Sequence, residues 1–87
     1  MIEKYDWLQR AKETYNFHIR CKADNEDWTL KHTAKRLRRS IGSISEDLLI
    51  ASWYKTHKVQ LEKFDYCYEA LEFIRKKEKE QQYEELE

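Results

Sequence analysis

The hydrophobic positions in the first quarter of the chain repeat with the period of an α-helix. From Glu3 to about Lys22, apolar residues recur every three or four positions with charged residues between them, namely Tyr5, Leu8, Ala11, Tyr15 and Ile19. Such a repeat is typical of a helix with one buried face. Residues 24–27 are all polar and favour a turn. The pattern therefore predicts a helix over about 3–22, followed by a loop.

The middle of the chain predicts two short helices separated by a few residues. Thr29 is a good N-cap for a helix from Leu30 to about Arg38, and Ser40 is a good N-cap for the next one. The expected inward positions of the first are Leu30, Thr33, Ala34 and Leu37, and those of the second are Ile41, Ile44, Leu48 and Ala51. We therefore predict a helix-turn-helix over about 29–51.

The last third of the chain predicts one long helix over about 57–80 with a charged tail to 87. Its apolar stripe would be Leu61, Phe64, Cys67 or Tyr68, Leu71 and Ile74, after which only Tyr83 and Leu86 are apolar. The sequence contains no proline and a single glycine, Gly42, so the usual punctuation of hairpins is missing. These patterns predict an all-α fold.

Composition limits the chain to one small, aromatic-rich domain spanning residues 1–87. Eighty-seven residues form one modest core, and aromatic residues make up 14% of them. No stretch reaches the apolar length of a membrane span or has the pattern of a secretory signal, so we expect a soluble, cytoplasmic protein. The two cysteines, Cys21 and Cys67, fit reduced thiols in that compartment, and a disulfide between them stays open.

Charge is distributed unevenly although the total is zero. Between Thr29 and Lys58 there are seven basic residues and two acidic ones, whereas from Val59 onward nine acids face five bases. Such an asymmetry is expected when the basic segment faces an anion and the acidic segment is kept away from it.

The middle segment also meets the packing needs of a helix-turn-helix. The motif requires a small residue where its helices cross, an apolar residue closing the first helix and branched apolar residues inside the second, which Ala34, Leu37, Ile44 and Leu48 supply. This segment resembles the helix-turn-helix of ParB-like and related phage or plasmid DNA-binding proteins. The resemblance is carried by Trp28-Thr29, Thr33-Ala34, Leu37, Ser40, Ser43-Ile44-Ser45, Asp47-Leu48 and Ala51, with Arg38 where that motif commonly has a turn glycine.

The resemblance implies a recognition helix whose exposed side lies in the major groove. Its outward residues would be Ser40, Gly42, Ser43 and Glu46, of which serine and glutamate can bond to base edges. The basic residues around it are expected to contact phosphates, which gives salt-dependent affinity without reading sequence. These expected phosphate contacts are Lys31, Lys35, Arg36, Arg38 and Arg39.

Other chemistries find little support in the sequence. His18 and Cys21 lie three residues apart, but structural zinc takes four ligands and only Cys67, His32 and His57 remain to supply them. No paired-carboxylate pocket, phosphate-binding glycine loop or nucleophile elbow is present. Trp53 and Tyr54 fit packing better than base stacking. We expect no enzyme activity, no metal site and no cofactor.

The sequence thus favours duplex DNA binding, in a role such as transcription regulation, segregation, replication or packaging. A single module of this size gains affinity from a second copy, so we expect a homodimer or higher homo-oligomer through the C-terminal helix. The alternative is a protein-interaction adaptor or inhibitor that docks on a protein partner with the same shape, which the neutral total charge and the acidic pair Glu46-Asp47 favour.

Overall fold

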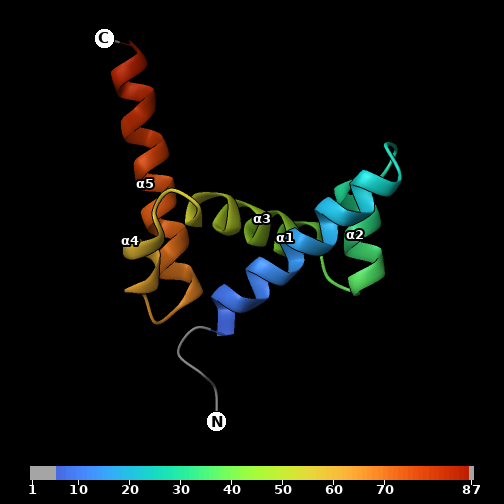
Figure 1. Ribbon diagram of the computed structural model, residues 1–87. Coiled ribbons are helices and arrows are strands. Elements are labelled where there is room, and N and C mark those ends of the chain that lie inside the picture. Colours follow the sequence, from blue (N-terminus) through green and yellow to red (C-terminus); the bar gives the residue numbers. More distant parts are fainter. Residues whose placement is uncertain (1–5, 87) are drawn as a thin grey trace.

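The computed structural model describes the backbone of residues 6–86 and the side chains of residues 7–81. Within that range the chain forms five helices and no strand, which confirms the predicted all-α fold (Figure 1). The helices are α1 (Asp6–Asp24), α2 (Leu30–Leu37), α3 (Ile41–Tyr54), α4 (Lys58–Glu62) and α5 (Cys67–Leu86). None of these five helices is long and apolar enough to cross a membrane.

The central element is α3, which contacts each of the other four helices. Figure 1 shows α2 near one end of α3 and the pair α4 and α5 at the other, while α1 runs across it. The buried residues of α3 include Ile44, Asp47 and Ile50, which lie on one side of the helix at helical spacing. The prediction that Ile41 is buried was wrong: it lies in the exposed first turn with 48% of its surface accessible.

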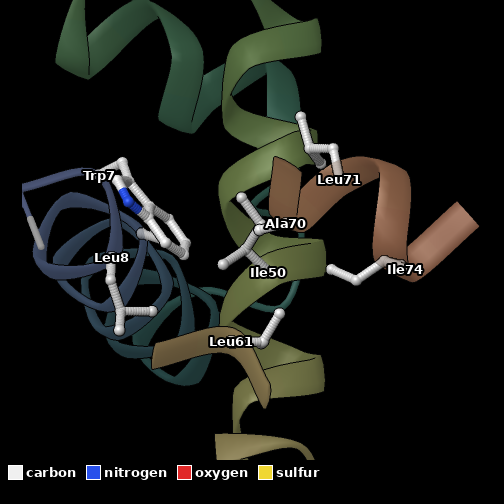
Figure 2. Close-up of a cluster of buried hydrophobic side chains, with 8 residues drawn as sticks. Trp7, Leu8, Ile50, Leu61, Ala70, Leu71 and Ile74 are labelled. Carbon is white, nitrogen blue, oxygen red and sulfur yellow. The ribbon is translucent and has the colours of Figure 1, made fainter. Parts of the chain in front are cut away.

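The apolar core lies at the α4 and α5 end of the molecule. It joins the start of α1 and the second half of α3 to α4 and α5 (Figure 2). Its buried members are Trp7, Leu8, Ala11, Ile50, Leu61, Ala70, Leu71 and Ile74. No residue of α2 belongs to this cluster, so α2 is held by other contacts.

The second half of α1 turns a polar face inward. We expected Tyr15 and Ile19 to continue the apolar stripe, but Tyr15 is only partly buried and Ile19 is 46% exposed. Thr14 and His18 are buried instead. They continue the face of Ala11 at helical spacing, and polar groups of α2 and α3 lie opposite them. Tyr5 falls outside the described residues.

The predicted single C-terminal helix over about 57–80 was also wrong, because the chain breaks between α4 and α5. Two hydrogen bonds fix the break. The Trp7 indole N–H donates to the Asp65 carbonyl at 3.1 Å, and the Tyr66 backbone N–H donates to Glu69 Oε1 at 3.1 Å. The second bond is the glutamate half of a capping box at the start of α5. The turn allows both α4 and α5 to contribute to the core.

Candidate nucleic-acid interface

A three-residue turn joins α2 to α3. At the start of α2, the Thr29 backbone N–H donates to His32 Nδ1 at 3.0 Å. At its end Arg38 is left-handed, with φ 56°, and the Arg39 N–H reaches back to the Ala34 carbonyl at 2.9 Å. This is the usual helix-ending motif, here with arginine in the position that glycine normally takes. The Ser40 side chain then accepts the Ser43 N–H at 3.1 Å and caps α3, as predicted.

Four of the five expected phosphate contacts are exposed to solvent. Lys31, Lys35 and Arg36 lie on the outer side of α2, and Arg38 lies in the turn. None of the four takes part in an ion pair within the described part of the chain. Lys35 and Arg36 also occupy the last turn of α2, where a positive charge interacts favourably with the helix dipole. Their charge therefore remains available to an external anion.

The fifth, Arg39, is directed into the protein rather than toward solvent. Its Nη2 lies 2.8 Å from Asp47 Oδ2, and its Nη1 donates to Thr14 Oγ1 at 3.0 Å. Asp47 is fully buried and is also paired with Arg10 at 3.3 Å. A buried carboxylate needs such partners, because an unpaired charge in the interior is costly. We therefore correct the expected role of Arg39: it connects the turn to α1 and α3.

The expected outward residues of α3 differ in their surroundings. Ser40, Gly42 and Glu46 are exposed. Ser43 is only partly exposed, and its hydroxyl accepts a hydrogen bond from Arg39 Nε at 3.2 Å, so it belongs to the same internal network. A Cβ atom added at Gly42 would meet no neighbouring atom within 4 Å, so the packing of the described residues leaves room for alanine there.

A second polar contact holds α2 against α1. The Trp28 indole N–H donates to Thr33 Oγ1 at 2.7 Å, and the same oxygen lies 2.7 Å from His18 Nδ1. Burial lowers the pKa of His18, and the nearby positive charge of Lys22 lowers it further. The neutral imidazole can therefore accept a hydrogen bond from the Thr33 hydroxyl, while the Thr33 oxygen accepts a hydrogen bond from the Trp28 indole N–H.

Thiol and metal chemistry add nothing to this surface. Cys21 and Cys67 are both free and partly buried, so the disulfide left open by the sequence is not formed. Burial is also the main cause that raises the pKa of the Cys67 thiol. Among the described residues, no three His, Cys, Asp or Glu side chains lie close enough together to hold a metal ion.

Sequence reasoning missed a groove beside the exposed basic residues. It is lined by Trp28, His32, Lys35, Arg36 and Arg38. The spacing of Trp28, His32 and Arg36, each four residues apart, was a signal that these side chains share one side of the chain at the start of α2. The buried position of Asp47 was missed as well, since the hydrophobic pattern carries no information about an ion pair across a turn.

Comparison with known proteins gives no match: no family model, no curated protein and no solved structure is significantly similar to this chain.

Proposed function

We propose that the protein binds duplex DNA through α2 and the start of α3. The observation that carries the proposal is the set of four exposed basic side chains, Lys31, Lys35, Arg36 and Arg38, none of which is neutralised by a carboxylate in the described residues. They lie beside a tight turn that leads into the exposed first turn of α3. A polyanion with regularly spaced phosphates complements such a surface.

Affinity in this proposal comes mainly from phosphate contacts. Apart from Ile41, the exposed residues at the start of α3 are small or acidic, with Gly42, Ser45 and Glu46 facing solvent. The arginine, lysine, asparagine and glutamine side chains that read guanine and adenine most strongly are absent from α3. We therefore propose strongly salt-dependent binding with modest preference among sequences.

A mobility-shift titration at low salt with several unrelated duplexes tests this directly. The proposal expects a shift with each duplex at similar protein concentration. It is wrong if no duplex shifts at concentrations where the protein remains folded and monodisperse.

One observation favours the second candidate, a protein-docking adaptor. Ile41 stands in the first turn of α3 and is 48% exposed, an apolar contribution to a surface that otherwise suits an anion. If the partner is a protein, Ile41→Ser weakens its binding while duplex DNA produces no shift. Pull-down from the cells that make the protein, compared between wild type and Ile41→Ser, distinguishes the two functions.

We also propose that two copies associate through the distal part of α5. Figure 1 shows the end of α5 extending away from the other helices, where it is available to a second copy. A dimer would present two copies of the basic surface of α2, and binding through both would raise the affinity for DNA.

A further inference from the structure

We propose that the groove beside α2 binds one unpaired nucleotide of single-stranded DNA, with the base against Trp28 and the phosphate on the neighbouring cations. The groove has a volume of about 410 Å³, which falls within the range of small-ligand sites. An aromatic wall next to basic side chains is the arrangement by which proteins hold single strands. A paired base inside a duplex does not offer its face, so this site goes beyond the proposed duplex binding.

The aromatic wall is fixed in place. The Trp28 ring lies 5.2 Å from the His32 ring at a tilt of 35°, and its N–H is bonded to the fully buried Thr33. His32 in turn accepts the Thr29 N–H at the start of α2. A ring that is already held in one orientation loses little freedom when a base packs against it.

The basic side of the groove is defined by Lys35, Arg36 and Arg38. No carboxylate lines this groove, whereas a second groove that shares Trp28 and Arg36 is also lined by Asp24. A phosphate therefore belongs beside Lys35, Arg36 and Arg38, where it contacts three positive charges and no competing acid.

The protein contains its own matched control. Trp53 and His57 form a second aromatic pair with the same spacing, with ring centroids 4.8 Å apart and a tilt of 37°. The groove beside that pair has a volume of about 260 Å³ and is also lined by Ser52, Thr56 and Gln81, with no lysine or arginine in its lining. If aromatic rings alone sufficed, both pairs would bind a nucleotide. The proposal selects only the Trp28 pair.

The test compares an oligothymidylate of eight nucleotides with an abasic strand of the same length, which has the same phosphates but no bases. The full-length protein should bind the oligothymidylate about tenfold more tightly, the lower range of one base stacked on an aromatic ring. Trp28→Leu should bring the two affinities together, and Trp53→Leu should leave the preference unchanged. Equal affinity of the wild-type protein for both strands overturns the proposal.

Intrinsic fluorescence gives a readout that does not depend on replacing Trp28. In Trp53→Phe, the remaining indoles are the buried Trp7 and the groove residue Trp28, so oligothymidylate should still quench the emission. Quenching that disappears in Trp53→Phe also overturns the proposal.

Lys31→Ala separates this inference from the proposed duplex binding. Lys31 is exposed but does not line the groove. Its replacement should weaken duplex binding and leave the preference for oligothymidylate over the abasic strand intact. If the protein prefers oligothymidylate over the abasic strand but binds no duplex, only the proposed function is wrong. If it binds duplexes but shows no preference between the two strands, only the nucleotide site is wrong.

Discussion

Arg38 is the one non-glycine residue of the described chain whose φ is positive. It adopts φ 56° without being glycine, and an L-residue in that region is strained because Cβ approaches the following carbonyl oxygen. Its side chain nevertheless stands exposed at the edge of the proposed DNA surface and of the groove. We interpret the strain as a local cost that places a positive charge in the turn.

Arg38→Gly should therefore stabilise the fold while weakening DNA binding. Glycine removes the left-handed strain, which stabilises the folded state, but it also makes the unfolded chain more flexible, which offsets part of the gain. The net effect should be a rise in the free energy of unfolding of about 0.5–1 kcal/mol. The control is Arg36→Gly. Because Arg36 lies inside α2, this substitution should lower the free energy of unfolding by about 1 kcal/mol. Urea denaturation measures both variants. A stability loss in Arg38→Gly would show that the arginine side chain itself supports the turn.

Asp47 and Glu46 are adjacent acids with opposite surroundings. Asp47 is fully buried between Arg10 and Arg39, whereas Glu46 is exposed on the proposed DNA-facing side of α3. Breaking a buried ion pair leaves its partner uncompensated, so Asp47→Ala should cost roughly 3 kcal/mol of stability. Glu46→Ala should change stability by less than about 0.5 kcal/mol and should strengthen nonspecific duplex binding, because it removes a repelling charge.

Thermal unfolding and a DNA titration of the two variants check this assignment. If Glu46→Ala unfolds the protein, or Asp47→Ala is neutral, the orientation given to α3 is wrong.

Polar contacts help to hold α2 in place. It contributes no member to the apolar core, and its buried Thr33 is bonded to Trp28 and lies against His18 of α1. The position of the basic surface therefore depends on a small polar cluster with a titratable member. We therefore expect the stability of this end of the molecule to depend on pH.

Stability should fall as the solution is acidified below neutrality. Burial lowers the pKa of His18 in the folded state below its ordinary value of 6.5. Above pH 6.5 the imidazole is neutral in both the folded and the unfolded state, and its full contribution to stability is present. As pH falls through 6.5, the unfolded state binds the proton first and stability is lost, until the folded pKa is passed. Urea denaturation between pH 7.5 and 5.5 measures the slope.

The control for this prediction is His18→Asn, whose amide oxygen can take the place of Nδ1 as an acceptor without titrating. Its stability should depend less on pH than that of the wild-type protein over this interval. Equal slopes for the two proteins would assign the pH dependence to other groups.

Helix positions were largely predictable where caps and spacing agree. The bounds of α2 and the start of α3 follow from Thr29, Ser40 and the apolar spacing between them. The break between α4 and α5 was not predictable in the same way, because Leu61 and Phe64 keep helical spacing and the break contains neither glycine nor proline. Of the two hydrogen bonds that fix the break, the one from Trp7 comes from about sixty residues away in sequence, and such a long-range contact leaves no local trace.

The candidate surface was predictable in its charges and less so in its geometry. Exposed lysine and arginine on α2 follow from the helical period, and four of the five expected contacts face solvent. Arg39 could not be distinguished from Arg38 by sequence, since they are neighbours of the same type. The left-handed turn directs one toward solvent and the other toward Asp47.

In the whole molecule, the basic surface of α2 and the apolar core lie at different ends. The apolar core lies around α4 and α5, and the basic surface lies around α2 near the other end of α3 (Figure 1). The acidic C-terminal segment is thus kept away from the surface that would meet an anion. Such separation leaves the end of α5 free to contact a second copy without covering the basic surface.

Self-association through α5 predicts a difference between the full chain and a truncation after Gln81. The truncation removes residues 82–87 and keeps every residue of the apolar core. Sedimentation equilibrium should give a dimer or larger particle for the full chain and a monomer for the truncated one. The same mass per particle in both would exclude the end of α5 as the contact.

The most direct test of the proposed function is the salt dependence of duplex affinity. Each phosphate contact contributes roughly 0.9 to the slope of log affinity against log salt. Lys31→Ala combined with Lys35→Ala should lower the slope by about 2 for every duplex tested, since both side chains are exposed on α2. Lys76→Ala combined with Lys79→Ala removes the same charge from exposed positions of α5 and should leave the slope unchanged. Equal slopes for the α2 variant and the wild-type protein, or an equal decrease in both variants, would contradict DNA binding through α2.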